Sequence, residues 1–422
     1  MTKLVLINSP IQKYSDSYRP KYRTTAPLGL GYLGTIARNA GIETVLIDAE
    51  AEKLTLPELT QKVNALNPQT VGINMTSTNY KISLEILDGI DSPHKMVGGA
   101  HATLKGEDIA RERPDLLVVK GEADDAFVDL VRNQRKGLVT TGLVNNLDNL
   151  PFIDRTLFSN DPYVNGDRKE SAMVTARGCP FSCVFCSVPV TNGRKVRTRS
   201  MNNVMAEIEQ LQTQGIDTIH FMDDIFNYDK TRLSEFCDSV NQRGLNLGWR
   251  ALARVELLND RELIEKMASA GCYKLAFDIE SGVPKILDYI GKCNDLDLIK
   301  SVFRNCREAG IETKAFFTIG HPPETEADIR RTIDFSQEIK ATEAYFMVVR
   351  AFPGTRLYDE MRKTGITEKE LDNYKQYQDE DGYVKYHVMN FRSLNGMSND
   401  HLDTMVKEAY GRFYKKPECC TI

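Results

Sequence analysis

Short apolar runs alternate with amphipathic stretches over the first 145 residues of this 422-residue chain. The amphipathic stretches, such as Leu30–Asn39, have the period of helices that cover a sheet. Strands alternating with helices predict an α/β fold with a parallel, doubly wound (Rossmann-like) sheet over residues 1–145. The predicted strands are rich in Val, Ile or Leu, and each ends near Gly, Asp, Asn or Ser: Leu4–Ile7, Thr44–Ile47, Thr70–Ile73, Lys95–Val97 and Leu116–Val119.

A second alternation covers residues 171–358. Six βα units predict an open, partial (βα)6 barrel, because a closed barrel of this kind has eight. Residues 146–170 have turn-forming residues and no clear period, which is typical of a linker. The polar residues 359–422 are expected to form a small α-rich region that faces the substrate. The six candidate strands are Ala172–Ala176, Thr218–Met222, Arg250–Ala253, Lys274–Ile279, Thr313–Ile319 and Ala344–Val349.

Charge and hydropathy exclude several classes of protein. The formal net charge of -5 gives no general reason to expect a nucleic-acid partner. No apolar run is long enough for a membrane span. The segment Met1–Pro10 lacks the long apolar core of a signal peptide and is better explained as a buried strand. We therefore expect a cytoplasmic protein with no membrane span.

Three of the nine cysteines lie within eight residues, directly after the first strand of the second alternation. They are Cys179, Cys183 and Cys186, in the pattern Cys-x3-Cys-x2-Cys. Nine cysteines are too few, and an odd number, for a secreted disulfide scaffold. Thiolates are the usual ligands of iron–sulfur clusters, and three of them leave one iron open to a small molecule. The alternatives are buried free thiols or structural zinc, although zinc usually takes four ligands and no fourth lies nearby in sequence.

This cysteine pattern resembles the signature of the radical S-adenosylmethionine (SAM) superfamily. Later strand ends resemble its other motifs, in Phe221–Phe226, Trp249–Arg254, Phe277–Gly282, Thr318–Glu324 and Ala351–Thr355. The resemblance implies that Cys179, Cys183 and Cys186 hold a 4Fe-4S cluster. It also implies three contacts with SAM: the backbone at Asp223 and Asp224 with the amino group, Arg254 with the carboxylate, and Glu280 with the ribose.

The first 145 residues resemble the cobalamin-binding branch of the same superfamily. The resemblance lies in Pro27–Leu33, in Val97–Thr103 and in Lys120-Gly121-Glu122. Glycines after a strand let the backbone approach a bulky ligand, and neighbouring hydroxyls could hydrogen-bond it. The positions implied for cobalamin binding are Leu28, Gly29, Thr76, Ser77, Gly98, Gly99, His101, Thr103 and Glu122.

Two absences sharpen this interpretation. The Asp-x-His-x-x-Gly motif that supplies an axial histidine in other cobalamin proteins is missing. Bound cobalt should therefore have no histidine below it, with His101 acting through its backbone. No cysteine precedes Cys179, which excludes the related methylthiotransferases, because those carry three further cysteines in the N-terminal domain.

The resemblance implies a cobalamin-dependent methyltransferase acting on an unactivated carbon or phosphorus of a small molecule or peptide. One SAM would methylate cobalamin, and a second, cleaved with an electron from a donor such as flavodoxin or ferredoxin, would give the substrate radical. The alternative is a cobalamin-dependent radical oxidoreductase or cyclase of the anaerobic tetrapyrrole ring-forming type, whose product gains no CH2. A non-enzymatic sensor would not need the full set of SAM motifs. The sequence identifies neither the substrate nor a catalytic side chain.

Overall fold

The computed structural model describes residues 3–11, 13, 25–158, 169–371, 374–378, 384–388 and 397–414. These residues form two compact units. Unit 1 comprises Met1–Cys179, Val188–Ile216 and Gln376–Lys385. Unit 2 comprises Pro180–Ser187, Asp217–Lys375 and Tyr386–Ile422.

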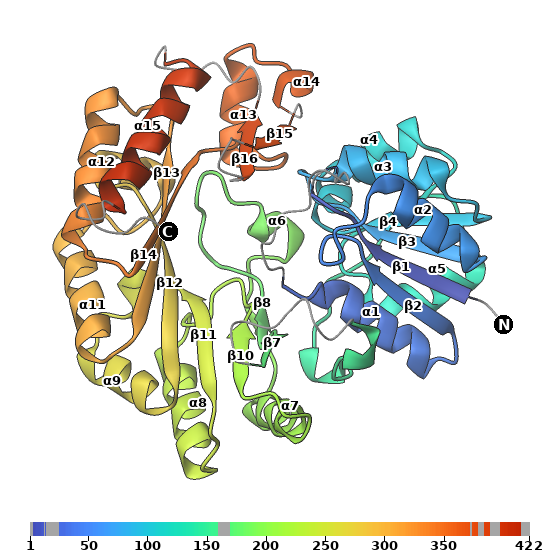
Figure 1. The fold of residues 1–422 in the computed structure, drawn as a ribbon, viewed down its shortest axis with the longest axis horizontal. Coiled ribbons are helices and arrows are strands. Elements are labelled where there is room, and N and C mark those ends of the chain that lie inside the picture. Colours follow the sequence, from blue (N-terminus) through green and yellow to red (C-terminus); the bar gives the residue numbers. More distant parts are fainter. Residues whose placement is uncertain are drawn as a thin grey trace. The chain divides into compact units, whose positions relative to one another are not determined.

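A six-stranded parallel sheet forms the centre of unit 1 (Figure 1). Its strand order is β2-β1-β3-β4-β5-β6, which confirms the predicted doubly wound fold. The edge strand β6 was not predicted, because only alternate residues are partly buried and it has no apolar run. The strands are β1 (Lys3–Asn8), β2 (Glu43–Asp48), β3 (Thr70–Asn74), β4 (His94–Gly98), β5 (Leu117–Lys120) and β6 (Gly137–Thr140).

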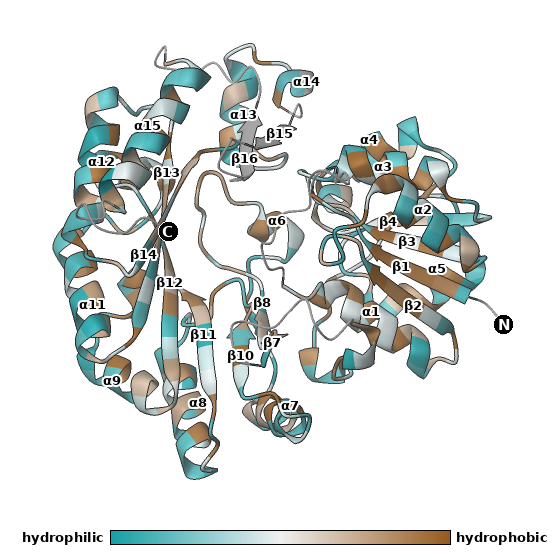
Figure 2. Ribbon diagram, in the orientation of Figure 1, coloured by the Kyte–Doolittle hydropathy of each residue, from teal (hydrophilic) through white to brown (hydrophobic). Residues whose placement is uncertain are grey.

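Helices cover both faces of this sheet and enclose two hydrophobic cores. Leu4 and Leu6 of β1 point into the core under α1 and α5, whereas Val5 and Ile7 point into the core under α2, α3 and α4. Figure 2 shows the resulting concentration of hydrophobic residues on the central strands. The helices are α1 (Leu28–Asn39), α2 (Leu56–Ala65), α3 (Tyr80–Gly89), α4 (Ala100–Glu112) and α5 (Phe127–Asn133).

The segment after β6 packs onto α1. Ile153, Leu157 and Phe158 join the core beneath that helix. A β-carbon at Gly31 of α1 would lie 2.7 Å from the Phe158 ring, so glycine is needed for this close contact. The first part of the segment predicted as a linker is therefore fixed by hydrophobic packing, while its residues 159–168 lie outside the described residues.

Unit 1 also holds the start of the second alternation. β7 (Glu170–Met173) is followed by a short antiparallel ribbon of β8 (Ala176–Arg177) and β9 (Arg197–Thr198). The helices of this part are α6 (Val188–Thr191) and α7 (Met201–Thr213). The ribbon was not predicted, because strands of two residues give no periodic pattern.

A parallel sheet with the order β14-β13-β12-β11-β10 forms unit 2. On β13, alternate residues from Thr313 to Ile319 are buried. With β7, the six strands follow the chain as predicted for a partial (βα)6 barrel. The strands are β10 (Thr218–Phe221), β11 (Gly248–Ala253), β12 (Cys272–Glu280), β13 (Glu312–Ile319) and β14 (Glu343–Val348); the helices between them are α8 (Lys230–Gln242), α9 (Arg261–Ser269), α10 (Pro284–Ile290), α11 (Leu296–Glu308) and α12 (Glu326–Glu338).

The C-terminal region is rich in helix, as predicted, with α13 (Arg356–Lys363), α14 (Glu368–Leu371) and α15 (Asn399–Phe413). It also contains an unpredicted two-stranded sheet of β15 (Tyr374–Gln378) and β16 (Val384–Val388). α15 packs on β14 and α12. Among the described helices, none is long and apolar enough to cross a membrane.

Candidate active site

The cysteine loop is anchored in unit 2 through Val184, which lies between Cys183 and Cys186. This side chain is fully buried in a hydrophobic core with α10 and the segment after β14. The Val184 amide donates to the Ile290 carbonyl at 2.9 Å, and the Val184 carbonyl accepts from the Leu357 amide at 2.9 Å. A further bond, from the Cys186 amide to the Cys183 carbonyl, closes the turn between these two cysteines at 3.1 Å. The spacing of Cys183 and Cys186 is therefore fixed by backbone bonds and core packing.

Arg254, which follows β11, lies against the cysteine loop. Its Nη1 is 3.3 Å from the Cys183 Sγ, and its guanidinium stacks 3.7 Å from the centre of the Phe181 ring. Its Nε donates to the Glu256 carboxylate at 2.6 Å. Its positive charge therefore lies beside a cysteine of the motif. The structure thus brings Arg254 to the predicted site, while its pairing with a SAM carboxylate stays a prediction.

The motif cysteines are more exposed than three of the four other cysteines that the structure describes. The seven cysteines that the structure describes form no disulfide, and Cys179, Cys183 and Cys186 are all partly exposed. Outside the motif, Cys237, Cys272 and Cys306 are buried. Burial raises the thiol pKa of Cys237 and Cys306 to about 12, which leaves them neutral. Neutral, buried thiols are poor metal ligands, whereas the motif cysteines are accessible to a cluster.

Glu280, at the end of β12, is a strained and buried carboxylate. Its φ of 70° lies in the left-handed region that residues with side chains rarely adopt. The β12–β13 register shifts beside it, between Asp278 and Glu280. Burial raises the pKa of Glu280 to about 7, although Lys292 opposes this shift. Strain and burial at one strand end are typical of a binding site, but contact with the SAM ribose stays a prediction.

Lys292 is a site residue that the sequence analysis missed. Its side chain is 9% exposed, and its Nζ lies 3.9 Å from Asp278 and 4.0 Å from Glu280. A buried lysine needs such counter-charges, and these carboxylates, with Cys183, raise its pKa against the effect of burial. The surrounding Ile290-Gly291-Lys292-Cys293 has no motif that would have revealed it.

A hydrogen-bonded chain leads from Glu280 to His321. The Thr318 hydroxyl donates to Glu280 Oε2 at 2.7 Å and lies 2.8 Å from His321 Nε2. His321 Nε2 can donate to this hydroxyl in the tautomer that carries its proton on Nε2. Burial lowers the pKa of His321 to about 3, so the ring is neutral. Its Nδ1 finds no hydrogen-bond partner among the described residues, and the side chain is fully buried in its loop.

The β10 end is tied to β11 by a residue that the sequence analysis did not select. Asn227 donates from its amide to the Arg254 carbonyl and accepts from the Arg254 amide, both at 2.8 Å. Asp223 is buried and Asp224 is partly exposed in the same loop. Asn227 therefore holds the loop of both predicted aspartates against the strand end that carries Arg254.

Replacing Glu280 by glutamine should stabilise the protein above neutral pH. The folded-state pKa of about 7 lies above the usual value of 4.5 for a glutamate carboxyl. The protonated carboxyl thus contributes stability below about pH 4.5 that is lost as the pH rises through about 7. At pH 8 the neutral amide avoids an ionisation cost on the order of 3 kcal/mol, at 1.36 kcal/mol per pKa unit. Thermal unfolding should give Glu280→Gln a higher Tm than wild type at pH 8 and an equal Tm at pH 4; equal values at both would refute the raised pKa.

The predicted cobalamin residues lie mainly at the carboxyl ends of β3, β4 and β5, which are neighbours in the unit 1 sheet. Ligands of doubly wound sheets bind at this edge. Thr76 and Ser77 follow β3, Gly99 to Thr103 follow β4, and Glu122 follows β5. Leu28 and Gly29 begin α1, with Leu28 buried and Gly29 exposed.

Gly99 is required for a different reason from the one expected. Its φ is 97°, and an added β-carbon would lie 2.3 Å from Asn74 Oδ1 and 2.9 Å from the Met75 carbonyl. The space that a side chain would take is thus filled by the protein itself. At Gly98, the nearest atom to an added β-carbon is in Val119, at 3.9 Å, so a methyl group fits there. Gly99 shapes the strand-end turn, and Gly98 is the position with room next to the backbone.

The polar side chains of this edge are largely bonded to one another. His101 Nδ1 lies 3.0 Å from the Ser77 hydroxyl, and its ring stacks on Tyr80 with centroids 4.3 Å apart. Burial lowers the pKa of His101 to about 4, so it is neutral. Thr103 donates to the Gly99 carbonyl and accepts from the Gly121 amide. These bonds fix the strand-end turns, while direct contacts with cobalamin stay predictions.

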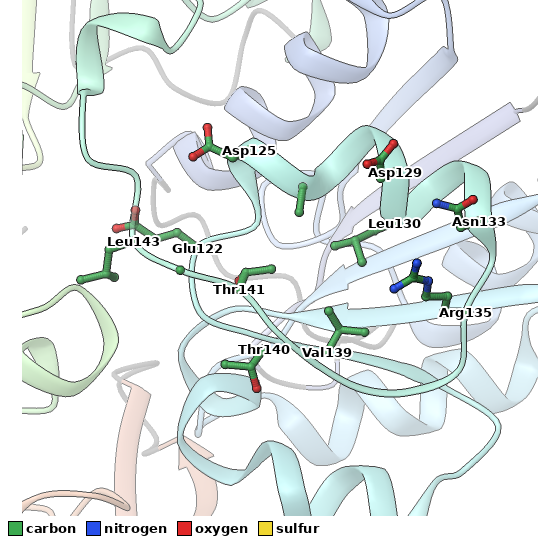
Figure 3. A pocket seen from close by; sticks show the side chains of 12 residues that line it. Glu122, Asp125, Asp129, Leu130, Asn133, Arg135, Val139, Thr140, Thr141 and Leu143 are labelled. Carbon is green, nitrogen blue, oxygen red and sulfur yellow. The ribbon is translucent and has the colours of Figure 1, made fainter.

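Glu122 faces arginine side chains. Its two oxygens accept from both terminal nitrogens of Arg197, at 2.6 and 2.7 Å, and one of them also accepts from the Val144 amide. Glu122 also borders a pocket of about 300 Å³ in unit 1 (Figure 3). None of the other predicted cobalamin residues lines that pocket, which therefore does not define the candidate site.

Comparison with known families agrees with this geometry. Residues 173–336 match the radical SAM superfamily, and residues 22–131 match the B12-binding domain. The chain belongs to the cobalamin-binding branch of the radical SAM superfamily. This confirms the family predicted from the cysteine motif and from the glycines after the N-terminal strands.

Relatives of this radical SAM protein include methyltransferases and a cyclase. It is 29% identical to an uncharacterized methyltransferase of Pyrococcus horikoshii, over 99% of this chain and 93% of that protein. It is 26% identical to the anaerobic magnesium-protoporphyrin IX monomethyl ester cyclase of Cereibacter sphaeroides, over 92% of this chain and 67% of that protein. Its fold resembles that of the radical SAM methyltransferase TsrM from Kitasatospora setae, solved with cobalamin and a [4Fe-4S] cluster, with a TM-score of 0.65 and 18% identity over 90% of this chain and 81% of that one.

Proposed function

We propose that this chain is a cobalamin-dependent radical SAM methyltransferase that acts on a small molecule or peptide. The proposal rests on one main observation: a single chain contains both of the domains that such an enzyme needs. It has a B12-binding domain, and it has a radical SAM domain whose three motif cysteines are reduced and partly exposed.

In this proposal Cys179, Cys183 and Cys186 hold a 4Fe-4S cluster. When bound, the cluster would supply the electron that cleaves SAM, and cobalamin would carry the methyl group. Arg254 places its positive charge beside Cys183. Its guanidinium can also pair with the SAM carboxylate.

The remaining SAM contacts are proposed at the ends of β10 and β12. Asp223 and Asp224 would present their backbone to the amino group, and Glu280 would accept ribose hydroxyls. Lys292 supports Glu280, because a cation 4.0 Å away compensates the charge of its ionised form. The hydrophobic core around Val184 holds the cysteine loop in place before SAM binds. The hydrogen bonds of Asn227 hold the loop after β10 against the end of β11.

Cobalamin is proposed to bind at the edge formed by β3, β4 and β5, with no histidine on cobalt. His101 supports this, since its Nδ1 is already bonded to Ser77 and its ring is stacked on Tyr80. Gly98 leaves open space beside the backbone, as a close-lying ligand requires.

A cyclase is the second candidate, because a relative of similar identity bears that name. The two functions differ in the fate of the SAM methyl group. Purified protein should be added to a cell extract, which supplies candidate substrates, together with SAM deuterated in its methyl group. The proposal predicts a new metabolite that carries the deuterated methyl, and that is absent when cobalamin is withheld. A product altered without any label would support the cyclase and contradict methyl transfer.

A further inference from the structure

Two carboxylates of the N-terminal domain, the partly buried Glu122 and the buried Asp124, bond the arginines on either side of the cysteine motif. Glu122 accepts from both terminal nitrogens of Arg197, whose side chain is 6% exposed. Asp124 accepts from both terminal nitrogens of Arg177, at 3.0 and 3.1 Å. Bidentate, charge-assisted pairs of this kind are strong and fix geometry. All four residues belong to unit 1.

These ion pairs stabilise the β8–β9 ribbon, which would be unstable without them. Arg177 of β8 and Arg197 of β9 are direct partners in the antiparallel register. Like charges directly opposite each other destabilise strand pairing, and an isolated two-stranded ribbon is marginal in water. Glu122 and Asp124 neutralise this repulsion from one side, so the ribbon depends on acidic residues more than fifty positions earlier in the chain.

The ribbon in turn fixes the first cysteine. The Cys179 amide donates to the Gly193 carbonyl at 3.1 Å. Gly178 has a φ of 100°, and an added β-carbon would lie 2.5 Å from the Lys195 carbonyl oxygen, so the two backbones are in close contact. Arg197 holds the same turn through a bond of 2.7 Å to the Asn192 carbonyl. A continuous set of contacts thus runs from Glu122 through Arg197 to the Asn192–Gly193 turn and Cys179.

We propose that Glu122 and Arg197 are positioning residues for the iron–sulfur cluster, which hold Cys179 in the geometry that the cluster needs. The sequence predicts a cobalamin contact for Glu122 instead, and the test below distinguishes the two roles. The inference rests on the cluster assignment of the proposed function. Residues behind metal ligands commonly change metal affinity by about 10–100-fold when they are mutated.

The test compares Glu122→Gln with Glu107→Gln. The first removes the charge of the buried pair and keeps its size; the second removes an exposed pair with Lys120 in the same unit. Anaerobically reconstituted Glu122→Gln should lose iron to a chelator about 10-fold faster than wild type. The electron paramagnetic resonance (EPR) signal of its reduced cluster should also change, while cobalamin binding stays at the wild-type level. Glu107→Gln should match wild type in all three measurements.

Arg197→Lys keeps the inference testable if Glu122→Gln fails to fold, because lysine keeps the charge but loses the bidentate fork. It should lose iron several-fold faster than wild type, and the double variant should be no worse than the worse single variant. Wild-type iron retention in both single variants would overturn the inference. Loss of cobalamin with an unchanged cluster in Glu122→Gln would overturn it too and restore the cobalamin contact. Wild-type protein that holds no iron would instead refute the proposed function.

Discussion

Replacing Cys179, Cys183 and Cys186 together by alanine is expected to abolish iron binding and the release of 5′-deoxyadenosine from SAM. Wild-type protein reconstituted under anaerobic conditions should hold about four irons per chain at this site. The three thiols are partly exposed and form no disulfide, so their removal leaves the buried cores intact. The triple variant should therefore keep its fold and lose the cluster absorbance.

Cys293→Ala is the matched control for this experiment. Cys293 is also free and partly exposed, and it lies next to Lys292 near the same site. Burial raises its thiol pKa, which disfavours the thiolate that metal binding needs. Iron content and 5′-deoxyadenosine formation should match wild type in this variant. Full iron content in the triple variant would refute the assignment of the cluster to the motif.

Gly99→Val is expected to abolish cobalamin binding. Valine would have to adopt a φ of 97°, which is strained for a β-branched residue, and its β-carbon would meet Asn74 at 2.3 Å. The turns after β3 and β4 would have to separate, which dismantles the edge where a ligand of this sheet should bind. Cobalamin affinity, measured by equilibrium binding, should fall by more than about 100-fold, since strain at such positions costs about 1–3 kcal/mol before the clash is added.

Gly98→Ala provides the control, because a methyl group at Gly98 meets only Val119, at 3.9 Å. Its circular dichroism should match wild type. Gly99→Val should still assemble its iron–sulfur cluster, which shows that the loss is confined to the cobalamin edge. Wild-type cobalamin affinity in Gly99→Val would show that the ligand binds elsewhere.

The elements that could be predicted from sequence are those with a strong local pattern. The five buried strands of the N-terminal sheet have apolar runs, and the cysteine motif is contiguous. By contrast, β6 is an edge strand with half its residues exposed, and β8 and β9 have two residues each. None of these three strands has a run of apolar or alternating residues long enough to indicate a strand.

The site was predicted less completely, because much of it depends on contacts between distant residues. Glu122 and Arg197 are 75 positions apart, and nothing in either segment indicates that they pair. Lys292 is buried only because the fold brings Asp278 and Glu280 to it. The role of Gly99 also required the structure, since its missing side chain makes room for Asn74 and Met75.

The most direct test of the proposed methyltransferase is the cobalamin content of the wild-type protein. Protein expressed with ample cobalamin should carry about one cobalamin per chain, bound at the carboxyl ends of β3, β4 and β5. Its EPR spectrum in the cobalt(II) state should lack splitting from a protein nitrogen, and His101→Ala should leave that spectrum unchanged. Protein that carries no cobalamin under these conditions would contradict the account and leave a radical SAM enzyme that works without it.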